Sequence, residues 1–208
     1  MGKTQVVVID YGMGNLWSVA SAIHFLGAEP LITTDTKEIS AAKFLILPGV
    51  GSFRRAMEII KQNSIDQAIL QSLSQPAAKL LGICLGMQLL GSSSSEDGNT
   101  QGLRLVPNRV QKFTNTADTR LKIPHVGFSE VKHGENTKLF SGIPNNSCFY
   151  FVHSYFMEIT PTISGVATCH HGTEFVAAFE QGQVSGTQFH PEKSQSMGLN
   201  LLKNFLES

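Results

Sequence analysis

The sequence predicts an α/β fold: a mostly parallel, doubly wound sheet that antiparallel strands extend, with helices on both faces. The first 92 residues alternate continuously apolar runs with segments of helical spacing, which is typical of parallel strands buried on both faces. Beyond residue 101, short strand-like runs are separated by turns, which indicates antiparallel hairpins. Neither a linker nor an internal repeat interrupts the chain, so we expect a single domain over residues 1–208.

The first half of the chain should contain four strands of the parallel sheet. Their apolar runs are 6–9, 30–33, 44–47 and 79–83. Helices are expected where apolar residues recur every three or four positions, and Gly27 can end the first of them. These segments are 16–26, 56–60, 65–73 and 85–90.

The second half should form hairpins and one closing helix. Residues 91–101 are rich in Ser and Gly, so a loop is expected there. Turns such as His133-Gly134 and Gln181-Gly182 separate the later runs, and a last helix is expected over 197–206. The expected strands are 109–113, 127–131, 148–152, 166–168, 175–179 and 184–189.

The composition excludes several classes of partner. Hydrophobic residues make up 41% of the 208 residues and charged residues 15%, which is too apolar for a disordered chain. Sixteen Lys and Arg balance sixteen Asp and Glu, so neither nucleic acid nor an anionic membrane is expected as the main partner. We expect neither a membrane span nor a signal peptide.

Cysteine and histidine usage predicts a reducing cytoplasm and no bound metal. The three cysteines are odd in number and widely spaced, which fits neither a disulfide framework nor a zinc site. His170-His171 lacks a third ligand at a suitable spacing. Residues 12–14 resemble the start of a dinucleotide fingerprint, but Trp17 occupies its third glycine position, so no such cofactor is expected. The cysteines are Cys84, Cys148 and Cys169.

The segment Gly82-Ile83-Cys84-Leu85-Gly86 carries the clearest chemical signal. It lies between an expected strand and an expected helix, as a nucleophile elbow does, here with cysteine as the nucleophile. A helix N-terminus lowers the pKa of a thiol and so favours the reactive thiolate. The alternative is a core cysteine at the end of a strand, because free cysteines are often buried.

A base for this nucleophile is expected at His190, with Glu192 as the group that orients it. In an extended segment, side chains two positions apart point to the same side, and Pro191 stiffens the backbone between them. The alternative is a surface histidine beside a solvated glutamate. Together with the elbow, the pattern favours a triad of Cys84, His190 and Glu192.

Oxyanion donors are expected from the loop Pro48-Gly49-Val50-Gly51. It follows the third expected strand, so it should lie at the same carboxyl edge of the sheet as Cys84. Its backbone N–H groups, with that of Leu85, could face a developing oxyanion. The alternative is an ordinary turn between a strand and a helix.

Together these residues resemble the class I glutamine amidotransferases of the triad type, from about residue 6 to residue 206. Within that family the chain is similar to the glutaminase subunits of imidazole glycerol phosphate synthase, because of its opening Asp-Tyr-Gly, Met87 after the elbow, and the Pro-Glu-Lys-Ser-Gln run. The resemblance depends on segments 10–16, 48–53, 82–90, 123–127, 150–155 and 188–195.

The resemblance implies roles for individual residues. Cys84 corresponds to the nucleophile, His190 to the base and Glu192 to the orienting group, and no metal or cofactor is implied. Gln88 lies one helical turn after Cys84, and a carboxylate such as Glu96 suits a substrate ammonium. Positions that hold glutamine correspond to Gly51, Leu85, Gln88, Glu96, Ser154 and Tyr155. Oxyanion positions correspond to Val50 and Leu85, and partner-facing positions to Phe128, Tyr150 and Lys193.

Two positions and one short run depart from the subfamily pattern. Phe128 stands where Trp is common, at the expected partner face. Gly91 stands where a large apolar residue is usual, and serines replace a more acidic run over 92–95. The loop that leads to Glu96 is therefore expected to be more mobile.

The resemblance also implies an activity and a partner. The chain would hydrolyse glutamine to glutamate and ammonia, and pass the ammonia to a cyclase subunit, which is a (β/α)8 barrel, in a 1:1 heterodimer. That cyclase converts PRFAR to imidazole glycerol phosphate and AICAR in histidine biosynthesis. Three alternatives stay open: a paralogous glutaminase that feeds another synthase, such as one making an amidino sugar; a cysteine hydrolase or peptidase; and a regulatory protein that only binds a partner.

Overall fold

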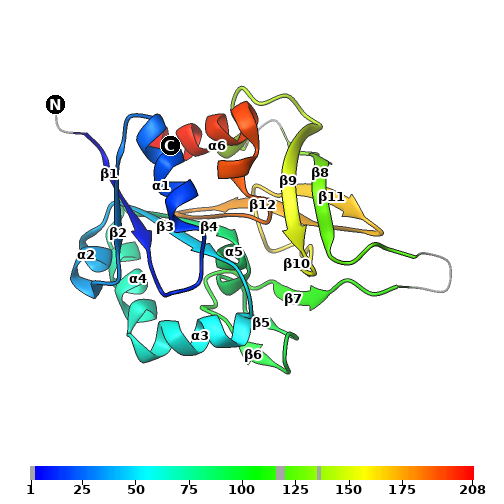
Figure 1. The fold of residues 1–208 in the computed structure, drawn as a ribbon, viewed down its shortest axis with the longest axis horizontal. Coiled ribbons are helices and arrows are strands. Elements are labelled where there is room, and N and C mark those ends of the chain that lie inside the picture. The colour runs from blue at the N-terminus through cyan, green and yellow to red at the C-terminus, as the bar shows by residue number, and fades with distance from the viewer. Residues whose placement is uncertain (1–2, 116–119, 135–136) are drawn as a thin grey trace.

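The computed structural model describes residues 3–115, 120–134 and 137–208, and a seven-stranded sheet lies at its centre (Figure 1). In the order β11-β12-β13-β4-β3-β1-β2, the last five strands are parallel, β12 pairs antiparallel with β13, and β11 pairs antiparallel with β12. The predicted fold class is thereby confirmed. The strands are β1 (Gln5–Ile9), β2 (Glu29–Thr33), β3 (Phe44–Gly49), β4 (Lys79–Cys84), β11 (Ala167–His171), β12 (Thr173–Gln181) and β13 (Val184–Thr187).

Helices cover both faces of this sheet, as expected. Side chains alternate between the faces along a strand, so Val6 and Val8 pack with α1 and α6, whereas Val7 and Ile9 pack with the helices of the other face. Helix α2 is additional to the expected elements, and Asp35 caps it by accepting from Lys37 N–H at 2.8 Å. The helices are α1 (Leu16–Phe25) and α6 (Gln195–Glu207) on the first face, and α2 (Thr36–Ala41), α3 (Phe53–Gln62), α4 (Ile65–Leu73) and α5 (Leu85–Leu89) on the second.

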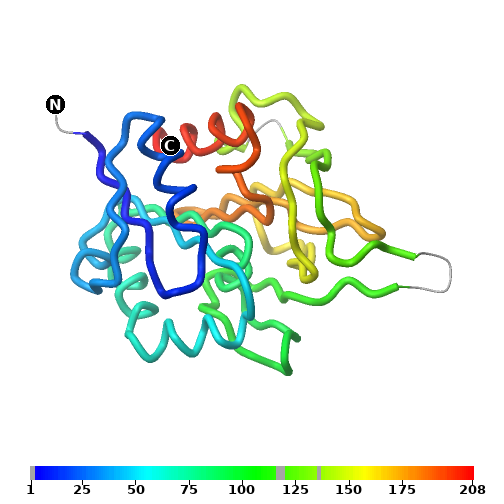
Figure 2. Tube along the Cα trace, in the orientation of Figure 1, coloured from blue at the N-terminus to red at the C-terminus, as the bar shows by residue number. Residues whose placement is uncertain are grey.

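Two smaller sheets lie beside the antiparallel end of the central sheet. One has the order β10-β7-β5-β6 and the other pairs β8 with β9. In Figure 2 the green-to-yellow strands β8 and β9 lie beside the orange strands, on the side of the molecule away from the N-terminus, whereas the green β5 and β6 lie lower, beside α3. The expectation of a loop over 91–101 is wrong in part, because β5 and β6 pair with each other there. The bounds are β5 (Ser93–Ser94), β6 (Thr100–Gln101), β7 (Arg109–Lys112), β8 (His125–Val131), β9 (Ser147–His153) and β10 (Tyr155–Met157).

The topology brings three distant segments to the carboxyl edge of the sheet. Strand β3 ends with Gly49 opposite Cys84 of β4, and β13 ends with Thr187 opposite Ile83 on the other side of β4. The chain after β13 then leads through His190 into a short 3₁₀ turn, η2 (Pro191–Lys193). A further 3₁₀ turn, η1 (Lys138–Phe140), precedes β9. Among the helices of the described ranges, none has the length and apolar character needed to cross a membrane.

Candidate active site

Cys84 lies in a sharp turn between β4 and α5. Its backbone has φ 55° and ψ −111°, a conformation that L-residues adopt only when the surrounding structure imposes it. The two glycines of the elbow permit this close packing. A Cβ atom on Gly86 would overlap the carbonyl oxygen of Leu47, and one on Gly82 would lie 2.7 Å from the Met87 backbone. The expected elbow geometry is therefore present at Cys84.

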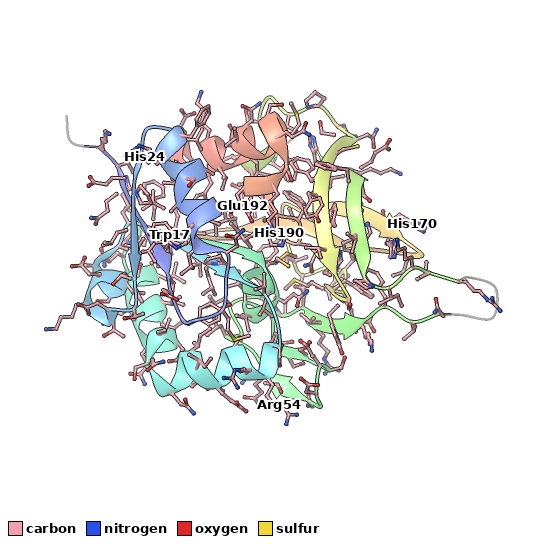
Figure 3. All side chains as sticks on the ribbon, in the orientation of Figure 1. Trp17, His24, Arg54, His170, His190 and Glu192 are labelled. Carbon is pink, nitrogen blue, oxygen red and sulfur yellow. The ribbon has the colours of Figure 1, made fainter. Side chains whose placement is uncertain are left out.

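His190 and Glu192 are joined directly. His190 Nδ1 lies 2.8 Å from Glu192 Oε1, and both side chains are almost fully buried. The expectation of an extended segment is wrong here, because Pro191–Lys193 forms the 3₁₀ turn η2. That turn still brings the carboxylate back to the imidazole, and Figure 3 shows the two labelled side chains next to each other beside α1.

Neighbouring groups favour the charged form of His190. Burial alone lowers the pKa of an imidazole, but the Cys84 sulfur and the Glu192 carboxylate outweigh burial and raise the pKa of His190 above its ordinary value. Within the described part of the chain, His190 Nε2 makes no hydrogen bond of good geometry. Of the two groups that raise the pKa of His190, the Cys84 sulfur has the larger effect.

A pocket of about 370 Å³ opens over Cys84. Every residue expected to hold the substrate or its oxyanion lines this pocket, together with three residues that were not expected there. The expected residues are Val50, Gly51, Leu85, Gln88, Glu96, Ser154 and Tyr155. The additional residues are Pro124, Val152 and His153.

Glu96 supplies the pocket with a carboxylate that α3 holds in place. One of its oxygens, Oε2, accepts from Phe53 N–H at 2.9 Å, at the first residue of α3. Partial burial raises the pKa of Glu96, and the bond from Phe53 opposes this shift. A carboxylate with one oxygen engaged in this way can direct the other at a cationic group in the pocket.

Gln188 and His153 belong to the site although no role was expected for them. Gln188 is fully buried, and its Nε2 donates to Cys84 Sγ at 3.7 Å. A sequence signal for Gln188 exists, since side chains two positions apart in a strand share a side and Gln188 lies two positions before His190. For His153 the only signal is its place directly before Ser154.

The three residues expected at the partner face lie together. Phe128 is 50% exposed, and its ring centroid lies 5.6 Å from that of Tyr150. Lys193 Nζ lies 5.9 Å from the same Tyr150 ring. Two positions along the same strands, Val126 of β8 pairs with Val152 of β9, and both are exposed to solvent. We call Val126, Phe128, Tyr150, Val152 and Lys193 the hairpin face.

Gly91, the second departure from the family pattern, is buried in a tight place. A Cβ atom there would lie 2.8 Å from the Asn108 carbonyl oxygen and 3.1 Å from that of Gln88. A large apolar side chain would therefore require the neighbouring backbone to move. The chain that follows is paired through β5 with β7 before it reaches Glu96.

The described residues contain no group of three His, Cys, Asp or Glu side chains arranged to hold a metal ion. His170 lies far from His190 and Glu192 (Figure 3). His171 instead stacks on His125, with ring centroids 4.2 Å apart. Neither His170 nor His171 lines the pocket over Cys84.

Comparison with known proteins agrees with this geometry. The model of the family "Glutamine amidotransferase class-I" matches residues 7–208. The chain is 41% identical to the imidazole glycerol phosphate synthase subunit HisH 1 of Parasynechococcus marenigrum, over 98% of this chain and 97% of that protein. It is 43% identical to the subunit HisH of Moorella thermoacetica, over 97% and 94% of the two chains.

Solved structures share the fold at lower sequence identity. A putative GMP synthase protein from Thermoplasma acidophilum matches with a TM-score of 0.74 at 20% identity, over 100% of this chain and 94% of that one. PurLQS from Thermotoga maritima matches with a TM-score of 0.74 at 17% identity, over 99% of each chain. On the family match, and on relatives of 41–43% identity over nearly the whole chain, this protein belongs to the class I glutamine amidotransferases.

Proposed function

We propose that this chain is the glutaminase subunit of imidazole glycerol phosphate synthase. It hydrolyses glutamine to glutamate and ammonia, and delivers the ammonia to a cyclase subunit that converts PRFAR to imidazole glycerol phosphate and AICAR. One observation carries the chemistry. The strained Cys84 elbow lines a pocket, and the Cys84 sulfur acts on buried His190, which is hydrogen-bonded to Glu192. The near full-length similarity to HisH subunits supports the pathway.

The proposed reaction begins with attack of the Cys84 thiolate on the side-chain amide carbon of glutamine. The resulting oxyanion accepts hydrogen bonds from backbone N–H groups of Leu85 and the Val50 loop. His190 then gives its proton to the departing nitrogen, the C–N bond breaks, and ammonia and a glutamyl thioester result. Neutral His190 next takes a proton from water, whose oxygen attacks the thioester. The C–S bond breaks, glutamic acid leaves and gives its new carboxyl proton to water, and the thiolate and the imidazolium are restored.

Specificity for glutamine is assigned to the polar rim of the pocket. The Glu96 carboxylate offers an ion pair to the substrate ammonium. Gln88, Ser154 and Tyr155 line the same pocket and offer amide, hydroxyl and backbone groups to the remainder of the amino acid. Gly51 leaves room for the substrate beside the Val50 loop.

A separate synthase subunit follows from the chemistry of the product. Ammonia released into water becomes ammonium, which is a poor nucleophile, so the acceptor site must lie close to Cys84. The hairpin face is the proposed docking surface, because it exposes apolar side chains and because Val152 also lines the pocket. The proposed partner is a (β/α)8 barrel cyclase in a 1:1 heterodimer.

The remaining proposals concern the chain as a whole. Residues 1–208 form one glutamine amidotransferase domain, since both cores share the central sheet. A reducing cytoplasm is the proposed compartment, because Cys84, Cys148 and Cys169 are all free thiols.

The test is glutamate release from glutamine, measured with and without a cyclase subunit that carries its ribotide ligand. We expect strong stimulation by the liganded cyclase, and no release by the Cys84→Ala variant under any condition. Activity that ignores the cyclase would contradict the proposed pathway and favour a different synthase, such as one that makes an amidino sugar. A Cys84→Ala variant with normal activity would contradict the chemistry.

A further inference from the structure

The fully buried side chain of Gln188 contacts the nucleophile and has no role in the mechanism given above. It follows β13, and its backbone N–H donates to Ala177 O at 2.7 Å, which fixes the chain at this point. Its side-chain Nε2 donates to Cys84 Sγ at 3.7 Å. This distance is within the range of a hydrogen bond to sulfur.

The orientation of the Gln188 amide follows from its other partners. The Tyr155 carbonyl can only accept, and it receives a hydrogen bond from Gln88 Nε2 at 2.8 Å. The second hydrogen of that NH₂ group reaches Gln188 Oε1 at 2.9 Å. The oxygen of Gln188 therefore faces Gln88, and its nitrogen must face Cys84. The Tyr155 carbonyl thus determines the orientation of the side-chain amides of both Gln88 and Gln188.

We propose that Gln188 is a further catalytic residue, whose amide N–H stabilises the negative charge on Cys84 Sγ. The inference rests on the proposed glutaminase function, since it extends the part that Cys84 plays there. A hydrogen bond to a charged group is stronger than one between neutral groups. The bond is therefore worth most when sulfur is an anion: in the resting thiolate, and again when sulfur leaves the carbonyl carbon during thioester hydrolysis.

Gln188 complements His190 because it cannot transfer its proton. His190 stabilises the thiolate only while it is an imidazolium, and it loses that charge once it protonates the departing nitrogen. An amide keeps its hydrogen throughout the cycle. Gln188 therefore remains a donor to sulfur in the steps in which His190 is neutral.

The alternative is a purely structural role, in which Gln188 only satisfies Gln88 in the core. The two roles differ in their effect on the thiol pKa. Gln188→Glu is nearly isosteric and keeps an oxygen for Gln88, but it replaces the donor that faces Cys84 with a second oxygen. Gln188→Met removes the donor without adding charge. Thr187→Val is the matched control, since Thr187 is equally buried and its hydroxyl is unpaired among the described residues.

The experiment measures the rate at which iodoacetamide alkylates Cys84, followed by mass spectrometry of its peptide over a range of pH. The midpoint of the plot of alkylation rate against pH gives the pKa of the Cys84 thiol. For Gln188→Met we expect this midpoint to rise by about one pH unit. Gln188→Glu should raise it further, because a carboxylate repels a thiolate. Thr187→Val should leave it unchanged. Thermal unfolding of each variant checks that it is folded.

Two outcomes would overturn the inference: a folded Gln188→Met or Gln188→Glu protein with the wild-type midpoint, or a Thr187→Val protein with the same rise. If one of the two Gln188 variants does not fold, the midpoint of the other variant tests the inference. The assay contains no glutamine, so it is separate from the test of the proposed function. A wild-type chain that alkylates normally but hydrolyses no glutamine would contradict only the function.

Discussion

The backbone at Cys84 depends on small neighbours. Its positive φ places Sγ at the pocket, and the strand-to-helix turn brings Gly86 against β3, where no room exists for a side chain. The strain is sustained by the packing of β3, β4 and α5 around the turn. Positions 82 and 86 therefore require glycine, because any Cβ atom there would overlap neighbouring backbone atoms.

We predict that Gly86→Ala destabilises the protein by roughly 2 kcal/mol or more, because the new Cβ atom would overlap Leu47 O and force β3 and α5 apart. Urea unfolding of the two proteins measures the difference. Gly134→Ala is the control, since a Cβ atom at that position meets nothing within 4 Å. Equal stabilities for Gly86→Ala and Gly134→Ala would show that the elbow tolerates a side chain.

At the scale of the elements, β8 and β9 are joined by a polarised chain of hydrogen bonds. His153 Nδ1 donates to Tyr155 O at 2.8 Å, so His153 Nε2 accepts from His125 Nδ1 at 3.1 Å. His125 Nε2 is then left to accept from Ser129 Oγ at 2.9 Å. Both imidazoles are neutral in this arrangement.

Burial, assisted by neighbouring histidines such as His171, lowers the pKa of His125 to about 4 and that of His153 to about 3. An unfolded histidine binds its proton at about pH 6.5. Between that pH and about 4, the unfolded state therefore binds more protons than the folded state. The contribution of these two histidines to the free energy of unfolding is therefore present in full above pH 6.5 and is lost as the pH falls through this window.

We predict that His125→Asn reduces this acid sensitivity. Asparagine can still donate to His153 but does not titrate, so the variant should lose less free energy of unfolding than the wild type, by about 1 to 2 kcal/mol near pH 5. Urea unfolding at neutral pH and near pH 5 gives both values. Parallel losses in the two proteins would mean that His125 does not contribute to the acid sensitivity.

The elements that the sequence predicts best are those with simple periodicity. Strands β1, β3 and β4 are continuous apolar runs, and α4 has the predicted bounds Ile65–Leu73. Strands β5 and β6 have two residues each and depend on pairing with distant chain, which no local pattern reveals. The Gln188–Cys84 contact spans 104 positions, so periodicity could place Gln188 near His190 but not its amide against sulfur.

At the scale of the whole molecule, the hairpin face is an apolar surface beside the pocket. Val126 is 49% and Phe128 50% exposed. Exposing these two side chains to water costs free energy, and a partner that covers them removes that cost. The expected family positions Phe128, Tyr150 and Lys193 could be placed on this face only after β8 and β9 were seen to pair.

We predict that Phe128→Asp weakens binding to the cyclase subunit about tenfold or more, because it places a carboxylate in an apolar contact. Isothermal titration calorimetry with the purified subunit measures the affinity. Leu70→Asp is the matched control, since Leu70 is 53% exposed on α4, which packs on the other face of the sheet. Unchanged binding by Phe128→Asp, or an equal loss in both variants, would contradict docking at the hairpin face.

The position of β13 also has a consequence for synthesis of the protein. This strand lies between β4 and β12 in the middle of the sheet, although it comes near the end of the chain. A nascent chain on the ribosome therefore carries Cys84 long before β13 can insert and bring Gln188 and His190 beside it. Incomplete chains hold the proposed nucleophile without its proposed base, so we expect translation that stops early to yield no fragment able to hydrolyse glutamine.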